Sequence, residues 1–167
     1  MNETYELRRA GLSEAAMLHE MMCAVSESMT DPSLYLVNPL EDVQEHLKHG
    51  GFALLAQTKS GEPAGCLICY VPLTEEENLG AESFAGESVY LMDTVVVLPQ
   101  HRGHRLQQRM LAAAQQMIDM PCYLMATVSP YNAPSLRSFQ KTGYEILQTK
   151  EKYGGYLRHV MYKEWNR

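Results

Sequence analysis

Basic side chains are concentrated between residues 95 and 111, in the stretch VVVLPQHRGHRLQQRML. Residues 100–109 hold three arginines and two histidines but no acid, whereas the whole chain has a formal net charge of −6. Three valines precede the proline and apolar residues at helical spacing follow it, so the basic residues lie where a strand turns into a helix. Such a turn presents unpaired backbone N–H groups and the positive end of the helix dipole, and arginine adds donors that match phosphate. The segment predicts a site for a phosphate-bearing ligand; the alternative is the solvated face of a surface helix.

The composition is that of an ordinary globular protein, with 46% hydrophobic and 20% charged residues. A length of 167 residues predicts one domain over residues 1–167. No stretch approaches the roughly 20 apolar residues of a membrane span, and the N-terminal MNETYELRRAGLSE lacks the apolar core of a signal peptide. We therefore expect a cytoplasmic protein without a membrane partner. The acidic balance argues against nucleic-acid binding, which favours a broad basic patch.

Two of the four cysteines, Cys66 and Cys69, have the C-x-x-C spacing of zinc and redox sites. The surrounding AGCLICYV is typical of a buried strand, on which residues three apart point to opposite faces. No second pair of ligands follows in the chain. The sequence therefore predicts free cysteines in the core and no metal site.

The hydrophobic periodicity predicts seven strands and four helices, in the order strand, helix, helix, three strands, helix, strand, helix and two strands. The expected strands cover residues 5–7, 52–57, 64–71, 89–98, 123–128, 144–150 and 157–163, and the expected helices cover 15–29, 40–47, 103–119 and 133–141. Interleaved helices and strands indicate one layered α/β domain with a mixed sheet.

The basic segment resembles the coenzyme-A loop of the GNAT superfamily of N-acetyltransferases. In that family a strand and a proline precede Arg/Gln-x-x-Gly-x-Gly/Ala, which opens a helix over the pyrophosphate. A second stretch, SPYNAPSLRSFQKTGYEIL, matches the family pattern Asn-x-x-Ala-x-x-x-Tyr-x-x-x-Gly-Phe at Asn132, Ser135, Phe139, Gly143 and Tyr144. The resemblance covers nearly the whole chain. It implies an α/β fold with a mostly antiparallel sheet of about seven strands flanked by about four helices.

The resemblance implies acetyl-coenzyme A as co-substrate and no metal. The implied cofactor-binding residues are Val95, Val96, Val97, Arg102, Gly103, His104, Arg105, Leu106, Gln107, Asn132, Ser135 and Phe139. Arg105 and Gln107 depart from the pattern, because glycines are usual at their positions when Arg102 starts the motif. A register that starts at Gln100 departs only at Arg105. A non-glycine residue still donates its backbone N–H, provided that its side chain points away from the pyrophosphate.

Acetyl transfer to an amine benefits from a base, because an amine with a pKa near ~10.4 is almost entirely protonated at neutral pH. In the family the base is often an acid on the strand before the pyrophosphate loop, and Asp93 has that position. The resemblance implies Asp93 as the catalytic base; the alternative is a strand-end aspartate bonded to a neighbouring turn. It also implies that a backbone N–H around Val95–Val97 stabilises the oxyanion, at an edge that the next strand leaves free.

The family often has a tyrosine seven residues after the asparagine, as the acid for the departing thiolate, but this chain has Phe139. Tyr131 and Ser135 are the catalytic substitutes that we expect, and Tyr144 is a further one. A thiol with a pKa near ~8.5 also leaves tolerably without help. Asn132 either bonds the cofactor or backbone, or caps a helix.

The acceptor side varies within the family fold. The resemblance implies contacts from the loop between the first two helices, with Asp31 and Tyr35, and from the hairpin around Tyr156. The loop 73–87 contains five glutamates and no base. It either attracts a cationic amine through its field or is merely solvated and mobile.

The predicted function is transfer of an acetyl group from acetyl-coenzyme A directly to a primary amine of a small molecule or peptide. The alternative is a catalytically weak or inactive acyl-coenzyme-A-binding sensor of the same fold, because Phe139 and the missing glycines depart from the pattern. An interaction module without ligand leaves the basic segment and both motifs unexplained. A homodimer through the C-terminal strands is compatible with the sequence.

Overall fold

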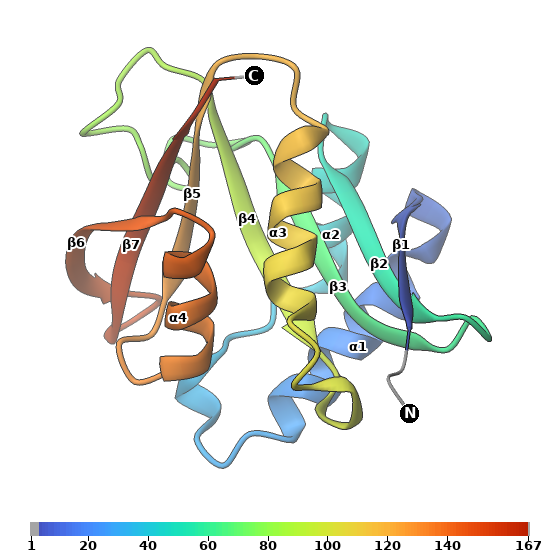
Figure 1. The fold of residues 1–167 in the computed structure, drawn as a ribbon. Coiled ribbons are helices and arrows are strands. Elements are labelled where there is room, and N and C mark those ends of the chain that lie inside the picture. The colour runs from blue at the N-terminus through green and yellow to red at the C-terminus, as the bar shows by residue number, and fades with distance from the viewer. Residues whose placement is uncertain (1–3, 167) are drawn as a thin grey trace.

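The computed structural model describes residues 4–166, which form a seven-stranded sheet with helices on both faces (Figure 1). The strand order is β1-β2-β3-β4-β5-β7-β6. The strands are β1 Tyr5–Ala10, β2 Phe52–Thr58, β3 Pro63–Tyr70, β4 Val89–Val97, β5 Cys122–Val128, β6 Glu145–Lys152 and β7 Tyr156–Trp165. The helices are α1 Ala15–Glu27, α2 Leu40–Lys48, α3 Leu106–Gln116 and α4 Ala133–Lys141, with short 3-10 turns at Leu12–Glu14, Pro32–Leu34 and Pro99–His101.

Every neighbouring pair of strands is antiparallel except β4 and β5, which run parallel. The expected mixed, mostly antiparallel sheet with four helices is therefore confirmed. The apolar faces of α1 and α2 cover one side of the sheet, and those of α3 and α4 cover the other (Figure 1). Amphipathic helices stabilise a sheet in this way because both faces of its central strands are apolar.

Element boundaries differ from the predicted ones where tertiary pairing extends or shortens a local pattern. β1 continues through Arg8 and Arg9 to Ala10, because its whole length pairs with β2. β7 continues to Trp165, which pairs with Cys122 of β5. The helix expected over 103–119 begins only at Leu106, because Gly103 and Arg105 have positive φ angles.

The two cysteines of the C-x-x-C pair diverge, as the strand pattern predicts. Cys66 belongs to the core under α1 and α2, whereas Cys69 belongs to the core under α3 and α4. Burial raises the pKa of the Cys66 thiol to about 12, so it remains protonated at neutral pH. Within residues 4–166, no group of three or more His, Cys, Asp or Glu side chains could hold a metal ion. None of the helices described in this range combines the length and apolarity needed to cross a membrane.

The parallel strands β4 and β5 separate partway along their length. They pair only where Val89–Leu91 meets Tyr123–Met125, and beyond these residues β4 pairs with β3 alone and β5 with β7 alone. Figure 1 shows the two strands diverging below this short region of contact. One edge of β4 is therefore open from Met92 to Val97, as the family resemblance implies.

Candidate active site

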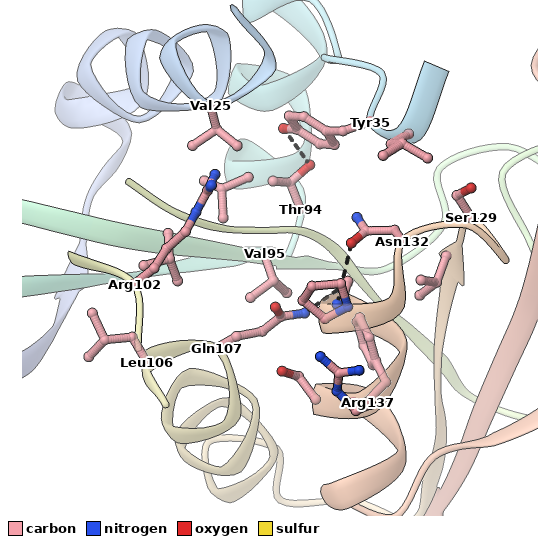
Figure 2. Close-up of a pocket in the computed structure, with 18 of the residues that line it drawn as sticks. Val25, Tyr35, Thr94, Val95, Arg102, Leu106, Gln107, Ser129, Asn132 and Arg137 are labelled. Atoms are coloured by element: carbon pink, nitrogen blue, oxygen red, sulfur yellow. Dashed lines mark hydrogen bonds between the residues drawn. The ribbon is translucent and has the colours of Figure 1, made fainter. Parts of the chain in front are cut away.

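A cavity of about 700 Å³ lies where β4 and β5 separate (Figure 2). It is lined by residues 92–97 of β4, residues 127–129 at the end of β5, the loop before α3, the first turns of α3 and α4, and the chain after α1. All the predicted cofactor-binding residues line it except His104. The His104 ring instead lies against Tyr5, with ring centroids 5.0 Å apart. Because it is lined from elements on both faces, the cavity reaches from the α3–α4 side of the sheet to the α1–α2 side.

The loop before α3 turns through left-handed backbone conformations. Gly103 has φ +86°, and a Cβ atom added there would meet nothing within 4 Å. Arg105 has φ 58° and ψ 27°, which costs a non-glycine residue roughly 1–2 kcal/mol. Arg105 thus adopts the conformation for which glycine is usual. No side chain caps α3, so its first N–H groups stay available for an anion.

Gln107 bridges the two helices on this side of the sheet. Its Nε2 donates to Ser135 Oγ at 3.0 Å, across the gap between α3 and α4 (Figure 2). The Gln107 side chain runs along the wall of the cavity and does not point away from it, in contrast to the orientation stated above as the condition for a non-glycine residue. Asn132 has the helix-cap role, because its Oδ1 accepts the Ser135 backbone N–H at 3.4 Å.

Positive charge surrounds the cavity on two elements. Arg102 and Arg105 line it from the loop, and Arg137 and Lys141 line it from α4. The sequence reasoning missed the α4 pair. Their four-residue spacing on a predicted helix, directly after the asparagine motif, was the available signal, since it places both on one helix face.

Asp93 lies on β4 at the α1–α2 side of the sheet and is partly buried. Its Oδ2 accepts from the Tyr70 hydroxyl at 3.3 Å, its Oδ1 accepts from Thr94 Oγ1 at 3.2 Å, and the Asn38 side chain bonds it as well. Burial raises the pKa of the Asp93 carboxyl, although these three hydrogen bonds act in the opposite direction. A buried carboxylate with a raised pKa is suited to accept a proton.

The open edge of β4 presents backbone donors beside this carboxylate. The Leu98 N–H donates to the Ala64 carbonyl of β3 at 2.8 Å. Backbone groups of successive strand residues point to opposite edges, so Val97 and Val95 direct theirs to the edge that β5 leaves. The pairing of β4 with β5 ends at Leu91, so these N–H groups lie beyond it.

Residues 15–144 match the family model described as "Acetyltransferase (GNAT) family". The chain belongs to the GNAT family of acetyltransferases. It is therefore an acyltransferase of a family that uses acetyl-coenzyme A. A comparison with curated proteins gave no match.

Solved structures of GNAT proteins share the fold over nearly the whole chain. YncA, a putative acetyltransferase from Salmonella typhimurium solved with acetyl-coenzyme A, is 14% identical, with 98% of this chain and 95% of that chain covered and a TM-score of 0.68. Aminoglycoside acetyltransferase AAC(6')-Ib, solved with coenzyme A and kanamycin, is 21% identical, with coverages of 96% and 95% and a TM-score of 0.64. A chain of the NatC complex, solved with Gag peptide and coenzyme A, is 12% identical, with coverages of 97% and 99% and a TM-score of 0.69. At these identities the likeness shows the fold.

Of the three acceptor-binding residues predicted from the sequence, one lines the cavity and two do not. Tyr35 lines the cavity, and its hydroxyl donates to Thr94 Oγ1 at 3.2 Å, so it is linked through Thr94 to Asp93. Asp31 and Tyr156 lie outside the lining residues. Asp31 caps the turn Pro32–Leu34 through the Ser33 N–H, and the Tyr156 ring lies 5.6 Å from the Arg158 guanidinium carbon.

The residues proposed for the departing thiolate also differ in environment. Phe139, at the position of the usual GNAT tyrosine, is 3% exposed and packs edge-on against Tyr144. Tyr131 is 73% exposed at the cavity wall. Ser135 lies inside the cavity and accepts the Gln107 hydrogen bond. Tyr144 is 2% exposed and does not line the cavity, so its hydroxyl is not presented to a ligand bound there.

The buried Tyr144 hydroxyl has no hydrogen-bond partner within the described part of the chain. An unsatisfied buried hydroxyl costs stability, so Tyr144→Phe is expected to raise the free energy of unfolding by about 1 kcal/mol. The melting temperature should rise by roughly 2–4 °C. Tyr162→Phe is the control, because its hydroxyl bonds Glu145 at the surface. Thermal unfolding of both variants measures the effect, and a less stable Tyr144→Phe protein would contradict this account.

Proposed function

We propose that this GNAT protein binds acetyl-coenzyme A in the cavity and transfers the acetyl group directly to a primary amine of a small molecule or peptide. The observation that carries the proposal is the open edge of β4. It lies between the uncapped start of α3 on one side of the sheet and Asp93 on the other. Direct transfer needs this arrangement, because the thioester and the amine must meet in one water-poor passage.

The residues present fit acetyl-coenzyme A. The start of α3, with Arg102 and Arg105, would hold the pyrophosphate, and Arg137 and Lys141 add positive charge on the facing helix. The bound coenzyme supplies a thioester carbonyl that is activated toward amines. The backbone N–H groups on the Val95–Val97 edge would donate to the negative charge that develops on the carbonyl oxygen, which is worth on the order of 10² to 10³ in rate.

Asp93 would accept the proton of the incoming amine, directly or through a water molecule. Its position on β4, close in sequence to the N–H donors, lets one strand serve both the amine and the carbonyl. Three hydrogen bonds hold the carboxylate, so it needs little reorientation when the amine arrives. The raised pKa makes the carboxylate a stronger base than an exposed aspartate.

Ser135 is the proton donor that we favour for the departing thiolate. The Gln107 Nε2 donates to Ser135 Oγ, which leaves the serine's own proton free to point into the cavity. Ser135→Ala is expected to lower kcat by roughly tenfold or less, because a thiol of pKa near ~8.5 leaves tolerably unaided. Tyr131→Phe should change kcat less than Ser135→Ala, since Tyr131 is exposed. Steady-state kinetics at saturating acetyl-coenzyme A compare them, and the reverse ranking would transfer the role to Tyr131.

The buried Phe139 favours a second candidate, an acyl-coenzyme-A-binding sensor with weak or no turnover. The two functions are separated by the release of coenzyme A thiol in the presence of a panel of small amines and peptide N-termini. Amine-dependent release supports the acetyltransferase. Saturable acetyl-coenzyme A binding without release across the whole panel would support the sensor instead.

A further inference from the structure

The acidic loop between β3 and β4 is anchored to the body of the protein. Phe84 stacks on Tyr123, with ring centroids 3.8 Å apart, and Leu79 packs against the core under α1 and α2. Glu77 is half-buried, whereas the other four glutamates of this loop are exposed. Its Oε1 lies 3.0 Å from His46 Nε2, and its Oε2 accepts the Leu73 N–H at 2.8 Å. The loop therefore sends one carboxylate inward, in contrast to the solvated run that its composition suggests.

His46, a buried residue of α2, is the partner of the Glu77 carboxylate. The histidine is 4% exposed, and its ring stacks flat on Tyr70, with centroids 3.6 Å apart and planes 9° from parallel. Glu77 thus fixes the imidazole at its edge, while Tyr70 fixes it at its face. Because Nε2 faces a carboxylate oxygen, that nitrogen carries a proton.

Tyr70 carries the contact on to Asp93. Tyr70 is the last residue of β3, and its ring stacks on the His46 imidazole. Its hydroxyl donates to Asp93 Oδ2 at 3.3 Å. A continuous chain of contacts therefore runs from Glu77 through His46 and Tyr70 to Asp93. Its members come from the acidic loop, α2, β3 and β4, and the cofactor side of the cavity contributes none of them.

We propose that His46, anchored by Glu77, is a positioning residue for acetyl transfer, which holds the Tyr70 ring and so aligns the Tyr70 hydroxyl with Asp93. The inference rests on the proposed role of Asp93 as the base. It gives the acidic loop an indirect role in catalysis, because Glu77 of this loop is the first residue in the chain of contacts that positions Asp93.

The groups that face Asp93 determine the sign of the expected pH effect. Tyr70 faces it from β3, Tyr35 from the chain before α2, Tyr153 from the β6–β7 hairpin and His46 from α2. Burial raises the pKa of each of these tyrosines, so they are neutral donors in the range of an assay. Burial also raises the pKa of Asp93, and the positive charge of His46 lowers it. Loss of that charge must therefore raise the pKa of Asp93 further.

The first test is the acid limb of kcat/KM, which rises with pH as the base loses its proton. His46→Phe keeps a ring against Tyr70 but removes the imidazole, and should move the midpoint of the limb to higher pH. Glu77→Gln, a mild change on the loop, should move it in the same direction by less. His49→Phe is the matched control, because His49 directly follows the same helix, is exposed and pairs with Glu45. It should leave the midpoint unchanged.

A carbon NMR titration of the aspartate carboxyls of the full chain gives a second readout, independent of turnover. Asp93→Asn identifies the Asp93 signal by its loss. A higher titration midpoint for Asp93 in both His46→Phe and Glu77→Gln supports the inference. An unchanged midpoint in both folded variants overturns it while leaving Asp93 as the base. If instead Asp93→Asn retains the acid limb, the proposed base is wrong and the positioning role falls with it.

Discussion

Asp93→Asn is expected to lower kcat/KM by roughly 10²- to 10⁴-fold and to flatten the part of the pH profile that rises with pH. The amide cannot accept the proton of the amine, whereas its size lets it remain among Tyr70, Thr94 and Asn38. The pKa of Asp93 is raised by burial, so the wild-type limb should lie above the usual range of an exposed aspartate. Initial rates across the pH range at saturating acetyl-coenzyme A measure the change.

The control for this substitution is Asp42→Asn, at an exposed position in the first turn of α2. It should leave both the rate and the limb as they are. Asp93→Asn itself should bind acetyl-coenzyme A with nearly unchanged affinity, because the carboxylate lies on the side of the sheet opposite to α3. A profile that still rises with the wild-type midpoint would rule out Asp93 as the base.

Replacement of Arg102 and Arg105 together by glutamate is expected to raise the dissociation constant for acetyl-coenzyme A by about 10²-fold or more. Each charge-assisted hydrogen bond contributes roughly 1.5–3 kcal/mol, and ~1.4 kcal/mol corresponds to tenfold in affinity. Both side chains line the cavity at the start of α3, where the helix dipole adds to their field. Calorimetric titration of the double variant measures the loss.

A double variant with the same change of net charge separates local contacts from the general field of the protein. Lys48→Glu combined with Lys150→Glu alters two positions that do not line the cavity. It should change the dissociation constant by less than about threefold at physiological salt, because charges in contact with solvent are screened beyond roughly 8 Å. Equal losses in both double variants would show that the basic loop makes no specific contact.

The elements and the basic loop were predictable from the sequence because their signals are local. Hydrophobic periodicity located all seven strands and four helices, and the proline followed by arginines marked the start of α3. The position of Asp93 on β4 followed from the same strand pattern. Local signals of this kind reflect backbone geometry, and tertiary contacts adjusted only the element ends.

The contacts around Asp93 could not be predicted from the sequence, because most of them join residues that are distant in the chain. Asn38 comes from the chain before α2, Tyr70 from β3 and His46 from α2, and their approach depends on how α2 and β3 pack. The bridge from Gln107 to Ser135 likewise depends on the spacing of two helices. The backbone conformation of Arg105 could not be predicted either, because arginine rarely adopts the left-handed conformation that the structure shows here.

The separation of β4 from β5 was expected only through the family resemblance. Both strands have apolar patterns that continue past the point where their pairing ends. Strand periodicity records which face is buried, and it holds no information about which edge is paired. The residues that form the open edge are therefore indistinguishable, in the sequence, from those of a fully paired strand.

Calorimetric titration of the purified chain with acetyl-coenzyme A, with adenosine diphosphate as the control ligand, tests the central claim most directly. We predict saturable binding at about one coenzyme per chain, with much weaker binding of the diphosphate, because the cavity continues from the α3 loop along the open edge of β4. Absence of saturation at millimolar acetyl-coenzyme A would mean an affinity weaker than roughly −4 kcal/mol. That result would contradict the assignment of this cavity as the coenzyme site.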